Sequence, residues 1–199
     1  AVFPSMARAP DDRGGASRLV AVKAVSGAYP LRGSLTVDAG QGESAVQQGP
    51  APGEVWADAA VLDGLQLKRG DELLLGDSRL RLARVIVIEP DRGAGFLNFA
   101  PRIMLNAADL PATGLVQPAS RVTYRLAVAA PAGKEAAVRR YTDWAGGVIK
   151  SQGLRGVRVE SLESGRPEMR QTLDRAQKFL NLVALLAALL AAVAVAIAA

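Results

Sequence analysis

The chain has 199 residues, with 24 Lys and Arg against 19 Asp and Glu, a net charge of +5, and neither Cys nor His. The lack of thiols and imidazoles excludes Cys and His zinc sites, cysteine nucleophiles and Ser-His-Asp triads. Nucleic-acid-binding surfaces cluster basic with aromatic side chains, whereas here the charges are spread and only 5% of residues are aromatic, so we expect no nucleic-acid partner.

Most of the chain has the pattern of short β-strands separated by turns. Runs rich in Val, Leu and Ile, bounded by Gly, Pro or Asp, predict strands at 19–25, 35–37, 54–57, 73–75, 79–89, 102–106, 121–129 and 157–162. The first 17 residues carry no clear signal, and residues 38–53, with four Gly and two Pro, are predicted to form a surface loop. The strand at 79–89 is predicted to have one solvated face in its first half and to be buried on both faces in its second half.

Two helices are predicted among these strands. Asp58 is a suitable N-cap for a short helix over 59–65. Over 134–145 apolar residues recur on one face at spacings of three and four, and Gly146-Gly147 is expected to end this helix. The pattern as a whole predicts an α+β domain over residues 1–164, rich in strands, with two or three helices.

The last 21 residues, Phe179 to Ala199, carry no charge, and Asn181 is the only polar side chain among them. At about 1.5 Å per residue this run reaches roughly 30 Å, the hydrocarbon thickness of a bilayer. The alternative is a buried core helix, but a helix that is apolar on every side needs a large protein around it. We therefore predict a transmembrane helix over residues 179–199.

A stalk helix over residues 165–178 is predicted to lead directly into this transmembrane helix. Pro167 suits the first helical turn, and no later Gly or Pro interrupts the helix. The apolar face of the stalk carries Met169, Leu173, Ala176 and Leu180. A continuous helix of about 33 residues would extend roughly 50 Å. Pro167 and the four apolar residues are thus predicted to couple the domain rigidly to the membrane.

Motifs for catalysis and for cofactor binding are missing from the sequence. Gly133-Lys134 is the only Gly-Lys pair, but Glu135 stands where a P-loop has Ser or Thr. No Ser lies three residues before a Lys, which excludes the Ser-x-x-Lys hydrolase pattern. The carboxylate pairs Asp11-Asp12 and Asp71-Glu72 are typical of solvated turns. We therefore predict no catalytic, cofactor-binding or metal-binding residue, and no enzyme.

One loop is a candidate for a hydrophobic contact. Phe96, Leu97 and Phe99 form an apolar group in a segment flanked by Gly. Exposed apolar groups often mark binding sites, which indicates contact with lipid or another hydrophobic ligand. The alternative is that the loop packs into the core, because small domains need their aromatic residues inside, and this is the interpretation that we favour.

Several segments, in chain order, resemble one family. Residues 53–86, GEVWADAAVLDGLQLKRGDELLLGDSRLRLARVI, are similar to the recurring block of the MacB-like periplasmic core domain, in which a short helix, a leucine-rich turn, a Gly-Asp and a hairpin follow one another. Residues 96–128 and 166–199 resemble the YbbP-type permeases of the FtsX/MacB/LolC superfamily of ABC transporters. The first 17 residues show the weakest similarity.

The resemblance implies a location and a mode of action. Such permeases hold a periplasmic domain between their first two transmembrane helices, so we expect this chain to be that domain, lacking its N-terminal part, plus the second helix. It would then lie in the bacterial inner membrane, with residues 1–178 in the periplasm. A separate YbbA-like ABC ATPase would drive it from the cytoplasm by mechanotransmission through the stalk. A lysophospholipase or esterase associated with the family indicates lipid-like or other hydrophobic cargo.

Two observations leave alternatives open. Basic residues normally flank the cytoplasmic end of a transmembrane helix, and Arg166, Arg170, Arg175 and Lys178 precede this one, which favours the opposite orientation. The chain could also be a membrane-anchored extracytoplasmic binding or scaffold domain without an ATPase partner. An enzyme is the third possibility, although no pair of nucleophile and base is visible.

Overall fold

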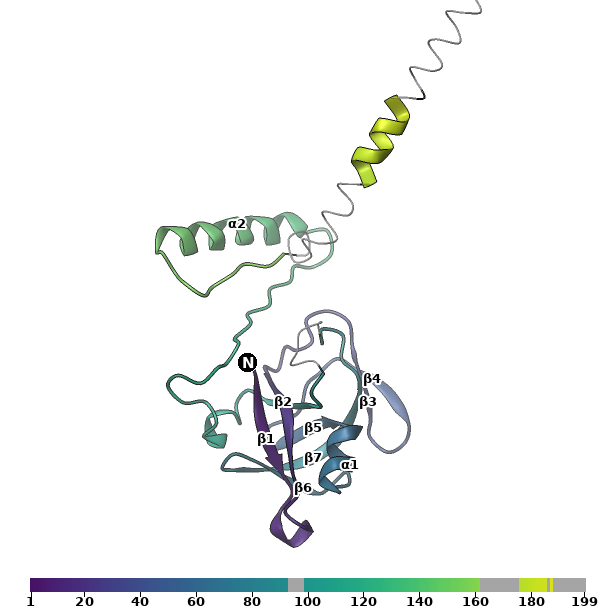
Figure 1. Ribbon diagram of the computed structural model, residues 1–199, viewed down its shortest axis with the longest axis vertical. Coiled ribbons are helices and arrows are strands. Elements are labelled where there is room, and N and C mark those ends of the chain that lie inside the picture. Colours follow the sequence, from purple (N-terminus) through teal and green to yellow (C-terminus); the bar gives the residue numbers. More distant parts are fainter. Residues whose placement is uncertain (93–98, 162–175, 186, 188–199) are drawn as a thin grey trace, which may run out of the picture. The chain divides into compact units, whose positions relative to one another are not determined.

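The computed structural model of the protein describes residues 1–92, 99–161, 176–185 and 187 (Figure 1). The chain divides into two compact units, Ala1–Ala129 and Ala130–Ala199. The domain boundary predicted at residue 164 lies outside the described residues, so it stays a prediction.

The first unit is rich in strands and the second contains a long helix. The strands are β1 (Val2–Arg8), β2 (Ser17–Val25), β3 (Leu35–Asp38), β4 (Glu43–Val46), β5 (Glu54–Asp58), β6 (Glu72–Leu75), β7 (Ser78–Ile88) and β8 (Arg102–Asn106). The helices are α1 (Ala59–Leu65) and α2 (Glu135–Ser151), with short 3-10 turns η1 (Asp11–Arg13) and η3 (Pro111–Thr113). The predicted α+β, strand-rich class is confirmed for the described part of the chain.

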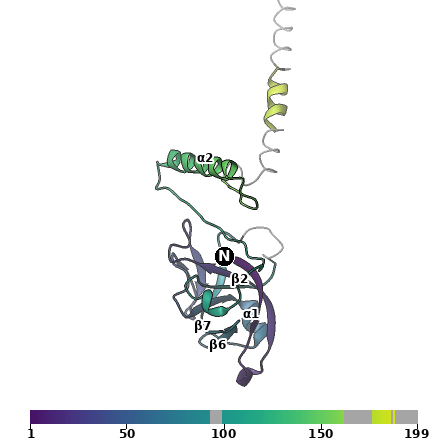
Figure 2. The same cartoon turned by 90° about the vertical axis from the view of Figure 1, so that its left-hand side faces the viewer.

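Six of the strands form a closed mixed sheet. Their order is β7-β5-β8-β2-β1-β6, and β6 pairs back to β7. The pairs β2–β8 and β5–β7 are parallel. The length of β7 makes this arrangement possible, because its first residues pair with β6 and its last residues pair with β3, which is joined to β4 as a hairpin. Figure 2 shows the same unit turned by 90°, and α1 lies against β2 and β5.

Side chains alternate between the two faces of each strand, which produces two apolar clusters. The interior cluster includes Val20, Val22, Val55, Ala57, Leu73, Leu75, Leu80, Leu82, Ile103 and Leu105, together with Val61 and Leu65 from α1. The exterior cluster consists of Val25, Leu35, Val37, Trp56, Ile86 and Met104. Burial of each Val, Leu or Ile side chain contributes about 1.5–3 kcal/mol, so the interior cluster supplies most of the driving force.

The sequence pattern misses β1 and β4. β1 contains Pro4 and lies in the segment without a clear signal, yet all seven of its residues pair with β2. β4 lies in the predicted loop, and Glu43, Ser44 and Ala45 are exposed. Both segments are strands because a neighbouring strand supplies backbone partners, which is information that local composition does not carry.

Two predicted strands are wrong as far as the structure describes them. In 121–129 only Thr123 pairs, as an isolated bridge in which it exchanges two 2.9 Å backbone hydrogen bonds with Val2. Tyr124 and Leu126 in that segment are 69% and 84% exposed. Residues 157–161 are not in a strand either, and residue 162 is not described. Alternation predicts an extended backbone, but a strand also needs a partner.

Two details of the predicted elements also differ. Val87 and Ile88 are 41% and 57% exposed, not buried, because the β5 ladder ends at Ile86 and the last residues of β7 lie beyond the closed sheet. α2 continues through Gly146-Gly147 to Ser151. Glycine in a helix costs about 1 kcal/mol, which weakens a helix without necessarily ending it.

The predicted stalk and transmembrane helix are described only in part. Residues 176–185 and 187 are helical, and among them Ala176 and Leu180 are exposed. Pro167, Met169 and Leu173 lie outside the described residues, as does most of the predicted span. None of the helices in the described ranges combines the length and the apolar character needed to cross a bilayer. The continuous stalk and span stay predictions.

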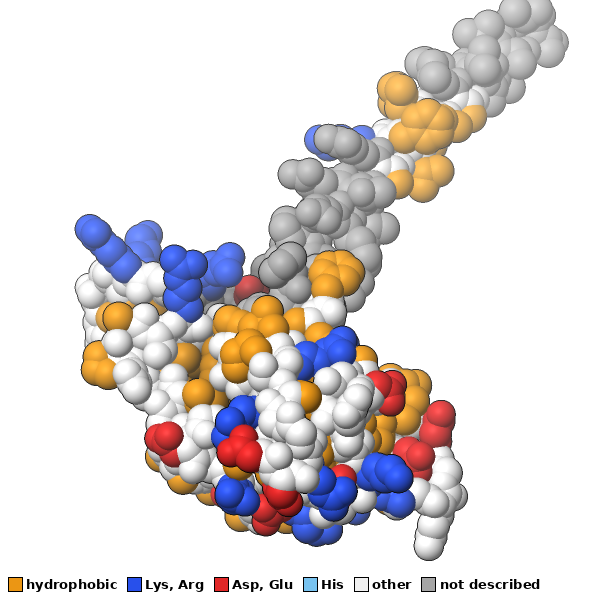
Figure 3. Space-filling view, turned by 60° about the horizontal axis from the view of Figure 1, so that its bottom comes forward, with side chains coloured by type: hydrophobic (Ala, Val, Ile, Leu, Met, Phe, Trp, Pro, Cys, Tyr) orange, Lys and Arg blue, Asp and Glu red, His pale blue; other side chains and the backbone are white. Residues whose placement is uncertain are grey.

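Acidic and basic side chains are interspersed over the β-rich unit on the face that Figure 3 shows. Exposed pairs include Arg8 with Asp11 at 3.0 Å and Arg79 with Glu72 at 3.3 Å. Exposed pairs of this kind contribute about 0–1 kcal/mol each. The charges of this face are thus those of a solvated surface of mixed sign.

Candidate functional site

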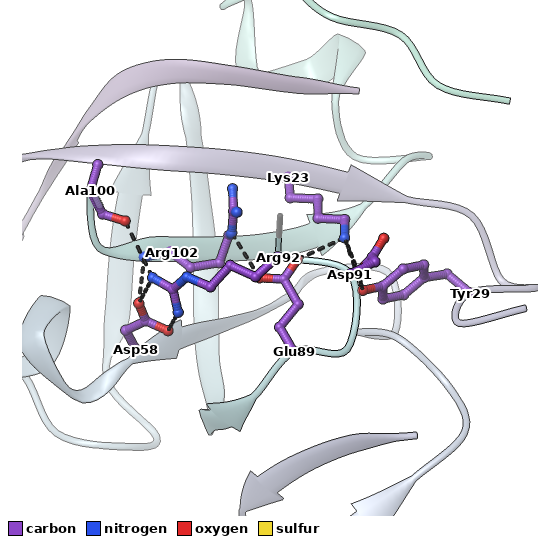
Figure 4. Close-up of polar contacts among 8 residues, drawn as sticks. All are labelled: Lys23, Tyr29, Asp58, Glu89, Asp91, Arg92, Ala100 and Arg102. Atoms are coloured by element: carbon purple, nitrogen blue, oxygen red, sulfur yellow. Dashed lines mark hydrogen bonds and ion pairs between the residues drawn. The ribbon is translucent and has the colours of Figure 1, made fainter. Parts of the chain in front are cut away.

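Charged side chains that are shielded from water lie on the exterior of the closed sheet (Figure 4). Glu89, directly after β7, is at the centre, and its side chain is 0% exposed. Its Oε1 accepts a hydrogen bond of 2.7 Å from Lys23 Nζ, and its Oε2 accepts one of 2.9 Å from Arg102 Nε. Because two cations share one carboxylate, the cluster needs further negative charge nearby.

Asp91 supplies part of that charge. Lys23 Nζ donates to Asp91 Oδ1 at 2.7 Å and to the Tyr29 hydroxyl at 2.9 Å, and it lies 4.3 Å from the centroid of the Tyr29 ring. The Tyr29 hydroxyl in turn donates to Asp91. Lys23 is therefore surrounded by one buried carboxylate, one half-exposed carboxylate and one aromatic ring.

Asp58 holds the other end of the cluster. The Arg92 guanidinium donates to both Asp58 oxygens, at 3.2 and 2.7 Å, and to the Ala100 carbonyl oxygen at 3.4 Å. Asp58 Oδ2 also accepts the Arg102 backbone N–H at 2.8 Å. Asp58 occupies the N-cap position of α1, but its side chain makes no cap hydrogen bond. The predicted capping role is wrong, because the carboxylate binds Arg92 and Arg102 instead.

These contacts fix both ends of the segment from Glu89 to Arg102. Its beginning is held through contacts of Glu89, Asp91 and Arg92, and its end through contacts of Ala100 and Arg102. We call Lys23, Tyr29, Asp58, Glu89, Asp91, Arg92 and Arg102 the ionic clamp. Residues 93–98 of the clamped segment are not described.

The candidate contact residues Phe96, Leu97 and Phe99 belong to this segment. Phe99 is 84% exposed, so the interpretation that it packs into the core is wrong for this residue. Phe96 and Leu97 lie outside the described residues, and their contact role stays a prediction. The structure thus places one large aromatic side chain in water, next to the fixed end of the segment.

The clamp shifts the pKa values of three of its members. Burial, followed by the hydrogen bond to Asp91 and the negative charges of Asp91 and Glu89, raises the pKa of the Tyr29 hydroxyl. Burial acts to raise the pKa of Asp91, but the hydrogen bonds from Lys23 and Tyr29 and the Lys23 charge outweigh it, so this pKa is lowered. The hydrogen bonds to Asp58 raise the pKa of Arg92.

These shifts predict how stability depends on pH. The contribution of Asp91, whose folded-state pKa is lowered, is present above about pH 3.9 and is lost as the pH falls through the folded-state value. The contribution of Tyr29, whose pKa is raised, is present below about pH 10 and is lost as the pH rises above it. We expect Asp91→Asn to flatten the acid limb, and Tyr29→Phe the alkaline limb, of unfolding free energy measured by urea titration. If the acid and alkaline limbs of the variants match those of the unsubstituted protein, Asp91 and Tyr29 do not cause this pH dependence.

The clamp is not among the sites that the sequence predicts, although a signal for it exists. Lys23 is the one charged residue in the apolar run LVAVKAV, and Arg102 begins the apolar strand RIMLN. A charge inside such a run needs a buried partner, because an unpaired buried charge is very costly. The partner Glu89 is 66 residues from Lys23, and local patterns do not identify it.

The clamp arranges charges but offers little for catalysis or metal binding. Each of its three carboxylates binds Lys or Arg. Across the described residues, no group of three or more acidic, His or Cys side chains could hold a metal ion. The arrangement is suited to positioning the segment from Glu89 to Arg102.

Comparison with known proteins supports the resemblance seen in the sequence. No protein-family model matches the chain. Over 185 residues, 93% of its length, the chain is 36% identical to part of an uncharacterized ABC transporter permease, YbbP, of Escherichia coli strain K12. The chain spans about a fifth, 21%, of the length of that relative.

Proposed function

Because the chain is homologous to a segment of an ABC transporter permease of the YbbP type, we propose that it forms the extracytoplasmic domain and second transmembrane helix of such a permease. The protein lies in the bacterial inner membrane with residues 1–178 in the periplasm. A separate, YbbA-like ABC ATPase hydrolyses ATP in the cytoplasm. The stalk transmits the resulting motion, which moves lipid-like or other hydrophobic cargo, and a periplasmic lysophospholipase or esterase is a further partner.

The observation that supports a hydrophobic contact is the exposure of Phe99 on a segment whose ends are fixed. A Phe side chain that is 84% exposed forgoes about 1.5–3 kcal/mol of burial, which contact with an acyl chain would recover. The ionic clamp holds Ala100 and Arg102, which follow Phe99, so less conformational entropy is lost when Phe99 binds. Phe99, together with Phe96 and Leu97, is proposed to contact the cargo.

Binding of a fluorescent acyl-chain probe to purified residues 1–178 tests this contact. The double variant Phe96→Ser, Phe99→Ser should bind the probe at least about tenfold more weakly, since two apolar side chains are lost. The matched control is Met6→Ser, Leu19→Ser, which alters another exposed pair of apolar side chains, neighbours in the β1–β2 ladder. Unchanged binding in a stably folded Phe96/Phe99 variant, or equal loss in the control, would remove the loop from cargo binding.

The periplasmic location has its own test. Ser44 is exposed on β4, so Ser44→Cys should react with a membrane-impermeant thiol reagent in intact, outer-membrane-permeabilised cells. Within these 199 residues there is no other Cys, so residue 44 would be the one labelled position of this segment. Protection of this Cys until the inner membrane is lysed would place the domain in the cytoplasm and overturn the proposed topology.

The competing proposals predict different partners and activities. A scaffold domain without an ATPase would not co-purify with an ATP-binding subunit, whereas the permease should. An enzyme would turn over ester or ATP substrates, but we expect neither activity from residues 1–178, because the sequence lacks a pairing of nucleophile and base. Turnover that disappears after substitution of one Ser or carboxylate would favour the enzyme.

A further inference from the structure

A hollow of about 390 Å³ lies beside the exterior apolar cluster. It is a separate site from the ionic clamp, although β5 contributes residues to both. β5 carries Glu54 and Trp56 in this hollow and Asp58 in the clamp. The other lining residues are Val46 at the end of β4, Gln47, Gln48, Gly49 and Ala51 from the chain after it, and Arg84 from β7.

Arg84 stands out because its guanidinium faces an aromatic ring and not a carboxylate. Its Cζ lies 5.0 Å from the centroid of the Trp56 ring. The nearby carboxylate of Glu54 is bound to Arg81 instead. Among the residues that the structure describes, no Asp or Glu forms an ion pair with Arg84. The Arg84 guanidinium is therefore open to an ion pair with an anionic ligand.

Trp56 adds a second donor that lacks a partner. Its side chain is almost fully buried, at 3% exposure, and its indole Nε1 has no hydrogen-bond acceptor within the described part of the chain. A buried donor without an acceptor costs about 1–3 kcal/mol. Nε1 has almost no accessible surface, so a ligand acceptor would reach it only after a small shift of the residues that cover it, and the hydrogen bond formed would then recover that free energy.

The chain between β4 and β5, which contributes several lining residues, is held in place by contacts with β8 and the residues after it. Asn106 Nδ2 donates to the Pro50 carbonyl oxygen at 2.9 Å, and the Gly53 N–H donates to Asp109 Oδ2 at 2.9 Å. Gly49 lies so close to β2 that an added Cβ would be 2.8 Å from Val25 Cγ2. Because this part of the wall is already ordered, less conformational entropy is lost when a ligand binds.

We infer that this hollow binds the carboxylate of a small amphiphilic molecule. Guanidinium matches a carboxylate with two parallel hydrogen bonds, and one Arg balances one negative charge. The nearby Glu54 disfavours a doubly charged phosphate. Val46, Ala51 and the Trp56 ring provide apolar surface for the rest of the ligand, and the amide groups of Gln47 and Gln48 provide further donors.

Titration of the ¹⁵N-labelled chain in detergent micelles, followed by NMR of the Trp indole N–H groups, tests the inference. The probes are hexanoate, acetate and inorganic phosphate, with chloride as the ionic-strength control. Hexanoate should shift the Trp56 resonance to saturation, acetate should bind more weakly, and phosphate should not compete. The resonance of Trp144, which is 61% exposed in the second unit, serves as the internal reference.

Two substitutions distinguish a specific binding site at Arg84 from a general attraction of anions to positive charges on the protein. Arg84→Gln should weaken hexanoate binding at least about tenfold, since the charge-assisted pair is lost. Arg79→Gln removes a charge from the same strand, where Arg79 pairs with Glu72 and does not line the hollow, so the affinity of this variant for hexanoate should stay the same. No saturable shift at Trp56, equal losses in both variants, or preference for phosphate would each overturn the inference.

Discussion

Replacing Glu89 by Gln is expected to lower the free energy of unfolding by about 3–5 kcal/mol, because it removes the charge that Lys23 and Arg102 share in the interior of the ionic clamp. The Lys23, Glu89 and Arg102 side chains are 10%, 0% and 2% exposed, so water does not replace the lost partner. Gln keeps the size of Glu, which limits the change in packing. Urea unfolding at neutral pH measures the effect.

Glu72→Gln is the matched control for this variant. Glu72 pairs with Arg79 at 3.3 Å, but both side chains are exposed, at 56% and 65%. Exposed pairs of this kind contribute at most about 1 kcal/mol. If Glu89→Gln costs no more than Glu72→Gln, the clamp does not stabilise the fold.

Leu173→Pro is expected to abolish ATP-driven movement of cargo in the complete permease while ATP hydrolysis continues. Pro within a helix removes a backbone hydrogen bond and costs about 3 kcal/mol locally, which would interrupt the predicted stalk. Reconstituted permease with its ATPase allows both activities to be measured in one preparation. Leu173→Ala keeps the helix and changes only the side chain, so it serves as the control.

The outcome of that comparison bears on mechanotransmission alone. Loss of cargo movement in Leu173→Pro but not in Leu173→Ala would support a rigid helical coupling. Unchanged movement in Leu173→Pro would remove the stalk from the mechanism and would leave the hydrophobic contact at Phe99 to be judged separately.

Elements that depend on local pattern were predictable from the sequence. The strand RIMLN at 102–106 and the helix at 59–65 have the predicted bounds, because apolar runs between turn residues determine them. β1 was not predictable, since its pairing with β2 and β6 depends on residues far along the chain. The same reason explains why 121–129 does not form a strand, although Thr123 makes an isolated bridge with Val2.

The candidate site was predictable only in part. The apolar group at 96–99 is visible in the sequence, but the exposure of Phe99 depends on where the ends of the segment are fixed. Those ends are held by Asp58 and Lys23, which are 44 and 68 residues from their partners Arg102 and Asp91. Charges within apolar runs indicate that buried partners exist, whereas identifying the partners requires the fold.

The most direct test of a hydrophobic contact on the clamped segment is photo-crosslinking in the complete permease. A photoreactive amino acid in place of Phe99 should form adducts with acyl-chain-containing molecules in membranes that carry the permease and its ATPase, and mass spectrometry would identify them. The same amino acid in place of Ser44, which is exposed on β4, should give few such adducts. Acyl adducts that are absent at residue 99, or equally abundant at both positions, would contradict the proposed contact.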